Sequence, residues 1–257
     1  MEKIFTHLGV RESLFSHADP QYKQFNKKLI PHIDEREMIG VRTPVLRMLA
    51  KNIANTNWRD FLQESWHFAH AEGSGALYFE EKMLHGFILG AVKNTELDEL
   101  FHYIKYHIRY LDSWAAVDSF ASSLKIAKKS PLHENYLKGF LEPYFYLPNI
   151  EQNEYQVRFA LVILHTSFIK KDNLDYIFDR VSKVKHSGYY VKMAKAWLLS
   201  ICFVHFPNET KEVLFDKKNP LALDEWTLKK TMQKIRESKR CTTEDRAFLN
   251  EKAKNLF

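Results

Sequence analysis

Cysteine is scarce in this chain of 257 residues, with Cys202 and Cys241 as its only two. Two cysteines cannot build a disulfide framework, and they suit the reducing cytoplasm, where we expect the protein to act. Glycine and proline are also few, with eight residues of each, which argues against a turn-rich all-β protein. The start, MEKIFTHLGVRESLF, has no apolar core of the kind found in signal peptides, so the sequence predicts none there.

Long hydrophobic runs and common catalytic motifs are missing as well. The most apolar stretch, residues 194–206, is shorter than the ~18–20 residues that a membrane span needs. The sequence has no HExxH, CxxC, P-loop or GxSxG motif. The pairs His67/His70 and His102/His107 do not form a persuasive metal-ligand set. We therefore expect a protein that uses neither metal nor cofactor and does not enter a membrane.

The composition favours one globular domain, residues 1–257. Hydrophobic residues make up 45% of the chain and aromatic residues 14%, which excludes a disordered protein. Lysine and arginine outnumber aspartate and glutamate by 38 to 32, so the net charge is +6. Such an excess permits binding to polyanions, including nucleic acid, without demonstrating it.

Helical periodicity runs through almost the whole sequence and predicts an all-α protein. Helix-start signals stand at the junctions, among them Thr43-Pro44 and Ser130-Pro131, where proline is tolerated in the first turn. The predicted helices span residues 2–17, 20–31, 43–54, 57–68, 75–93, 95–110, 113–129, 131–146, 153–169, 172–185, 189–206, 223–238 and 243–255.

From about residue 95 the predicted helices fall into pairs of similar length. Comparable positions in the second helices recur at Trp114, Arg158 and Trp197, which are 44 (158 − 114) and 39 (197 − 158) residues apart. HEAT and armadillo units have periods of ~40–47 residues and stack into solenoids. The sequence therefore predicts a HEAT-like helical-repeat solenoid, an α-α superhelix whose second helices lie side by side.

Trp114 and Asp118 are the most informative pair. Four residues apart on a helix, they project from one face, and Asp112 or Ser113 can cap that helix. A π-face beside a carboxylate suits a cationic base or sugar and can direct a water molecule at it. The alternative is a core tryptophan beside a surface aspartate, which an isolated WxxxD motif does not exclude.

Two later helices supply candidate partners for this pair. Arg158 is the only formally charged residue between positions 155 and 169; it either reaches out to solvent or holds a phosphate or the aspartate. Trp197 suits either the core or a site. Lys192 and Lys195 precede it on the same helix and make that end electropositive.

Three segments in this order resemble the family of HEAT-like repeat DNA glycosylases that repair alkylated DNA. They are SWAAVD at 113–118, the YQVRFALVIL helix and VKMAKAWLL, and the similarity extends from GVRTPVLR at 40–47 to about Arg236. The resemblance implies a solenoid whose concave basic face grips alkylated duplex DNA, and an enzyme that excises cationic N3- or N7-alkylated purines by hydrolysing the N-glycosidic bond.

The resemblance also implies a role for each candidate residue. Trp114 and Trp197 would be aromatic walls around the damaged nucleoside, and Asp118 would be the carboxylate that stabilises an oxocarbenium-like sugar and orients water. Arg158 would contact the backbone phosphate, and we count a few further cations as DNA-binding residues: Arg42, Lys192 and Lys195.

One stretch departs from the family pattern. Residues 26–39 read NKKLIPHIDEREMI, where active relatives have an aromatic-rich helical stretch that approaches DNA. The chain thus resembles a branch with a missing or remodelled N-terminal DNA-recognition element. The alternative to a glycosylase is a catalytically inactive HEAT-repeat relative that binds nucleic acid structures or protein partners. In either case we expect a monomer.

Overall fold

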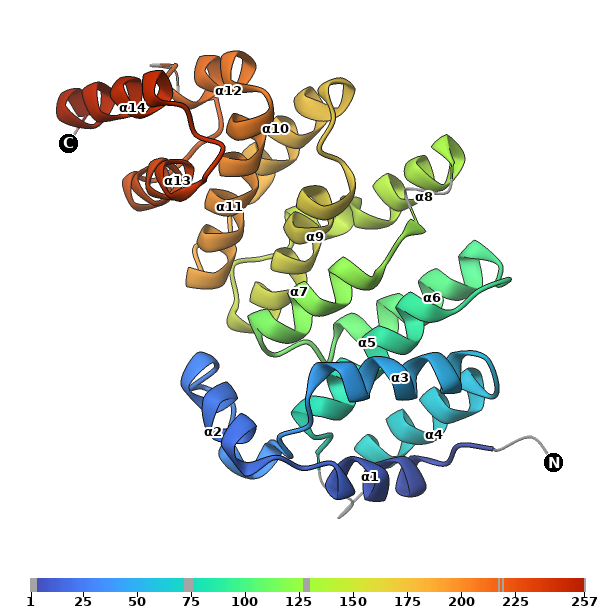
Figure 1. Cartoon of the computed structure of the whole chain (residues 1–257). Coiled ribbons are helices and arrows are strands. Elements are labelled where there is room, and N and C mark those ends of the chain that lie inside the picture. Colours follow the sequence, from blue (N-terminus) through green and yellow to red (C-terminus); the bar gives the residue numbers. More distant parts are fainter. Residues whose placement is uncertain (1–3, 72–75, 127–129, 217, 219, 257) are drawn as a thin grey trace. The chain divides into compact units, whose positions relative to one another are not determined.

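The computed structural model describes residues 4–71, 76–126, 130–216, 218 and 220–256. Its secondary structure is helical throughout these residues, with 14 α-helices and no strand among them, which confirms the all-α prediction. The chain divides into two compact units, Met1–Lys125 and Ile126–Phe257. Each unit is described by itself below (Figure 1).

The described residues of the first unit form seven α-helices, of which α3, α5 and α7 pack in succession. α5 is the centre of this row and is buried from Phe79 to Leu89. In chain order the helices are α1 (His7–Ser16), α2 (Pro20–Leu29), α3 (Thr43–Ala54), α4 (Trp58–His70), α5 (Phe79–Ala91), α6 (Leu97–Ile108) and α7 (Trp114–Ser123), with a short 3-10 helix η1 (Glu35–Glu37) before α3.

α4 and α6 form a second layer of this unit, and both polar contacts between their side chains have an offset of 40 residues. Arg59 is paired with Glu99, and the Gln63 amide donates to the Tyr103 hydroxyl at 2.9 Å, each across 40 positions. Such a fixed offset is what stacked helix hairpins of one repeat length produce. This offset supports the predicted helical repeat. It rests on contacts between helices, whereas the sequence prediction rested on the spacing of similar residues.

The second unit continues the same pattern, with α9, α11 and α13 packed in succession. The Glu134–Lys170 and Arg180–Glu142 ion pairs join its neighbouring hairpins across 36 and 38 residues. Its helices are α8 (Pro131–Leu141), α9 (Glu154–Ser167), α10 (Leu174–Lys183), α11 (Tyr189–His205), α12 (Pro207–Leu214), α13 (Glu225–Glu237) and α14 (Thr243–Leu256), with short 3-10 helices η3 (Glu142–Tyr146), η4 (Glu151–Asn153) and η5 (Lys171–Asn173).

Prolines account for the clearest differences from the predicted helix boundaries. The helix predicted to reach residue 31 ends at Leu29, because the residue before Pro31 is pushed out of the helical region. The helix predicted over 131–146 changes at Glu142 to the 3-10 helix η3, which has proline in its first turn. Pro207 opens α12, a helix that the periodicity missed.

Some predicted boundaries lie outside the described residues. Residue 75, where one helix was predicted to start, and residue 129, where another was predicted to end, fall there. The described residues beside them show that both predictions were wrong: α5 begins only at Phe79, and α7 ends at Ser123, before the extended Leu124. Among the described residues, no helix combines the length and apolarity that crossing a bilayer requires.

Candidate active site

Trp114 and Asp118 lie on the same side of α7, as predicted. Ser113, rather than Asp112, caps the helix, and its hydroxyl accepts the backbone N–H of Ala116 at 3.3 Å. Both Trp114 and Asp118 are half-buried. The pair is therefore neither sealed in the core nor fully in solvent.

The opposite side of α7 explains this orientation. Ala116 and Phe120 are buried on that side, and the Ser123 hydroxyl donates to the Gly86 carbonyl oxygen of α5 at 3.3 Å. α7 packs on α5 so closely that a Cβ atom on Gly86 would lie 3.0 Å from Phe120. Residues three and four apart share a helix face. Burying this apolar face leaves the face of Trp114 and Asp118 away from α5.

The stretch that follows α2 is attached to the start of α7. The Trp114 indole N–H donates to the Leu29 carbonyl oxygen at 3.2 Å, which fixes the ring edge. The His32 Nε2 atom lies 2.9 Å from the Asp112 carbonyl oxygen and donates to it. Lys82, which is buried, pairs with the Asp112 carboxylate at 2.5 Å and lies 4.0 Å from Glu37. Residues 29–37 thus orient one of the proposed aromatic walls.

The loop before α3 places Arg42, one of the predicted DNA contacts. The buried Glu80 carboxylate accepts the backbone N–H groups of Ile39, Gly40 and Val41 at 2.9, 2.7 and 3.4 Å. Burial raises the pKa of Glu80, and the backbone hydrogen bonds lower it. The effect of burial is larger, so the pKa lies above its usual value. Gly40 has a φ of 97°, in the left-handed region that glycine adopts without strain.

Arg42 itself is exposed and already has local partners. Its guanidinium pairs with Asp19 at 2.7 Å and lies 5.0 Å from the centre of the Tyr22 ring. The Arg42 hydrogen bond contributes to lowering the pKa of the Asp19 carboxyl, after the larger effect of the Tyr22 backbone N–H. A phosphate contact by Arg42 would compete with this exposed ion pair and stays a prediction.

Arg158 lies in α9 of the second unit and is 5% exposed, so the alternative in which it reaches out to solvent is wrong. Its Nη1 atom donates to the Tyr190 carbonyl oxygen of α11 at 2.8 Å. This bond holds the guanidinium at the first turn of α11, where the backbone N–H of Tyr190 also donates to Glu154 at 2.6 Å.

Trp197 lies on α11 and is half-buried, with His165 of α9 against its ring. The two ring centres are 4.1 Å apart and the planes are tilted by 37°. Burial, with a smaller contribution from Arg158, lowers the pKa of His165 to about 4. His165 is therefore uncharged at neutral pH, and the Trp197 ring is held against a neutral imidazole.

The two lysines on α11 have different surroundings. Lys192 is half-buried, pairs with Asp224 at 3.3 Å and lies 5.0 Å from the centre of the Trp226 ring. Lys195 is buried and donates to the Val184 carbonyl oxygen at 2.7 Å. Burial lowers the pKa of Lys195 to about 8. Contact of either lysine with DNA stays a prediction.

The candidate residues fall into two groups. Trp114 and Asp118 belong to the first unit, and Arg158 and Trp197 to the second. Within its unit, each group combines an aromatic face with a carboxylate or a guanidinium. Their convergence into one site stays a prediction.

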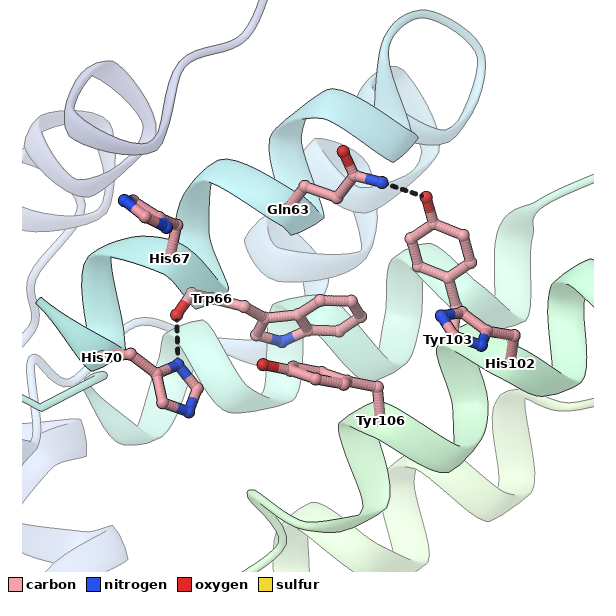
Figure 2. Close-up of a pocket in the computed structure, with 7 residues that line it drawn as sticks. All are labelled: Gln63, Trp66, His67, His70, His102, Tyr103 and Tyr106. Carbon is pink, nitrogen blue, oxygen red and sulfur yellow. Dashed lines mark hydrogen bonds between the residues drawn. The ribbon is translucent and has the colours of Figure 1, made fainter.

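Sequence reasoning missed the aromatic pocket between α4 and α6. Figure 2 shows its lining side chains, with the Trp66 and Tyr106 rings against each other. The signal for it was present, since Trp66 and Tyr106 stand 40 residues apart, as do His70 and Tyr110. A search for repeats at that period would have paired these aromatic positions. Among the described residues, no group of three or more His, Cys, Asp or Glu side chains is arranged to hold a metal ion.

Comparison with known proteins gives one result. A family model described as DNA alkylation repair enzyme matches residues 10–235, which is most of the chain. No curated protein and no solved structure matches it.

Proposed function

The chain belongs to the family of DNA alkylation repair enzymes, and from this premise we propose that it excises cationic N3- or N7-alkylated purines from duplex DNA. The observation that carries the proposal is the half-buried Trp114 and Asp118 pair on the face of α7 that does not pack on α5. A carboxylate beside a π-face is suited to positive charge, which both an alkylated purine and the sugar from which it departs carry.

The proposed reaction breaks the bond between C1′ of the sugar and the purine nitrogen. The bonding electrons move to the purine and neutralise its positive charge, so the leaving group needs no general acid. The sugar passes through an oxocarbenium-like state, as in other N- and O-glycoside cleavage, and the Asp118 carboxylate stabilises it. Water then adds to C1′ and loses one proton, which the Asp118 carboxylate accepts.

The other candidate residues have supporting roles in this proposal. Trp114 and Trp197 flank the damaged nucleoside, and the neutral His165 behind Trp197 adds no positive charge that would repel a cationic base. Arg158 supplies a guanidinium for the phosphate near the lesion, held in place through the Tyr190 carbonyl oxygen. Arg42, Lys192 and Lys195 are the proposed further contacts to the DNA backbone.

A base-release assay on methylated duplex DNA tests the proposal. Under single-turnover conditions, Asp118→Asn is expected to lower the rate of 7-methylguanine release on the order of 10²-fold, because it removes the negative charge that stabilises the transition state. Asp60→Asn is the matched control, since Asp60 is exposed in the first turn of α4, and it should keep the wild-type rate. Equal rates for wild type and Asp118→Asn would exclude Asp118 as the catalytic carboxylate.

A further inference from the structure

The pocket between α4 and α6 has a volume of about 340 Å³ and lies wholly within the first unit (Figure 2). It is built on the second layer of helices, whereas Trp114 and Asp118 lie on α7 in the row formed by α3, α5 and α7. This volume is at the lower end of the range for small-molecule sites. The pocket is therefore suited to a ligand the size of one nucleotide.

The floor of this pocket is aromatic. The Trp66 ring centre lies 4.5 Å from that of Tyr106 and 5.7 Å from that of Tyr103. Tyr110 follows one turn later, with its ring nearly parallel to Trp66 at 6.4 Å. Aromatic surfaces of this kind bind planar rings by stacking, whichever base the ring belongs to.

The rim carries uncharged or weakly basic polar groups. Gln63, His67, His70 and His102 surround the opening and are exposed, and none of the described residues that line the pocket is a carboxylate, lysine or arginine. The Gln63 side-chain amide donates to the Tyr103 hydroxyl at 2.9 Å. This bond uses the amide nitrogen, so the Gln63 side-chain oxygen can accept a hydrogen bond from a ligand. A carboxamide and imidazoles can form hydrogen bonds with the edge of a nucleobase.

Two cations continue from the rim along α6. Lys105 and Arg109 follow His102 by three and seven positions, so they lie on the same helix face. The Arg109 guanidinium lies 5.8 Å from the centre of the Tyr106 ring, and neither cation has a carboxylate partner in the part of the chain that the structure describes. The acidic residues of this helix, Asp98 and Glu99, lie about one turn before His102, at the end away from Arg109, and Glu99 pairs with Arg59.

From these features we propose that the α4–α6 pocket binds an unpaired nucleobase, with the phosphate of the same nucleotide at Arg109 and Lys105. An aromatic floor that takes the base and cations that take the phosphate are the two parts of a site for single-stranded nucleic acid. The site is separate from the proposed excision site, and it does not depend on base release. It gives the protein a second contact with nucleic acid, for a strand with exposed bases.

Binding of a fluorescent single-stranded oligonucleotide tests the proposal. Tyr106→Ala removes a half-buried stacking ring and is expected to weaken single-strand affinity about tenfold, while Tyr106→Phe keeps the ring and the affinity. Arg109→Ala should also weaken binding and reduce its dependence on salt. Tyr136→Ala, at an exposed tyrosine of α8, is the matched control and should bind like wild type.

Two further measurements locate the site and identify the source of the base. An oligonucleotide containing 5-iodouracil should form a light-induced crosslink to peptides from α4 or α6, and a mononucleotide should compete if free nucleotides are the ligand. Wild-type affinity in both Tyr106→Ala and Arg109→Ala, or crosslinks only outside α4 and α6, would overturn the proposal. Release of methylated bases is measured on the same variants and should be unchanged, so failure of this site and failure of the proposed excision are distinguishable.

Discussion

His107 shows how strongly burial controls the charge of single side chains in this protein. It is fully buried in α6, and neither of its ring nitrogens has a hydrogen-bond partner in the described part of the chain. Its ring packs edge-on against Phe120 at 4.9 Å and lies 5.9 Å from His85. Burial lowers the pKa of His107 to about 3 and that of His85 well below its usual value.

These histidines predict a loss of stability in mild acid. The unfolded chain binds a proton on His107 near pH 6.5, whereas the folded chain binds it only near pH 3. The stability that comes from burying a neutral His107 is therefore fully present above pH 6.5. As the pH drops from 6.5 toward 3, the free energy of unfolding falls by about 1.4 kcal/mol per pH unit. In urea unfolding between pH 7 and 5, His107→Phe should flatten this dependence.

An exposed histidine provides the comparison for that experiment. His17 is exposed at the end of α1, so His17→Gln should keep the wild-type dependence of stability on pH. A slope that His107→Phe leaves unchanged would mean that other groups cause the loss of stability in acid.

Among the helices, α5 is the element on which the first unit depends most. It is buried along most of its length, and its Glu80 fixes the loop that leads into α3 through three backbone N–H groups. This connection joins two helices of the same row across about one repeat. The start of α3, with the exposed Arg42 before it, is therefore set by a carboxylate 38 residues later (80 − 42).

Glu80→Ala is expected to lower the free energy of unfolding by about 3 kcal/mol, because it leaves buried backbone donors without an acceptor. Chemical denaturation at pH 7 measures the difference. Glu12→Ala, at an exposed position of α1, should change the free energy of unfolding by less than about 0.5 kcal/mol. If both variants were equally stable, Glu80 would not anchor the loop.

The elements show what the sequence can predict and what it cannot. The long amphipathic helices could be predicted because the apolar faces that pack in rows leave a helical period in the sequence. The start of α7 could be predicted because a serine, which caps helices, precedes it. α12 was missed because it has only eight residues, about two turns, which is too short a stretch to establish a helical period. The ends of α2 and α8 depend on single prolines, which override the periodicity.

The candidate site was predictable in its residue types but not in their contacts. Helical spacing placed Trp114 and Asp118 on one face, and the structure has them there. That the Trp114 ring is held by the Leu29 carbonyl oxygen, or that His165 lies against Trp197, depends on tertiary packing between distant residues. The burial of Arg158 has the same origin, because its partner is a backbone group of another helix.

At the scale of the whole molecule, the net charge of +6 and the family both favour DNA as the substrate. The proposed excision residues are divided between the two units, with the carboxylate in the first and Arg158 and Trp197 in the second. The α4–α6 pocket lies in the first unit alone. We therefore propose two sites on the helical repeats, one that excises the alkylated base and one that binds an unpaired base.

The central claim is that a carboxylate and aromatic faces remove a base because that base is already positively charged. The most direct measurement compares release by wild-type protein from two matched duplexes, one with 7-methylguanine and one with the neutral base hypoxanthine at the same position. We predict that 7-methylguanine is released and leaves an abasic site, while hypoxanthine stays attached over the same time. No release from the methylated duplex, or release of both bases at equal rates, would contradict the account.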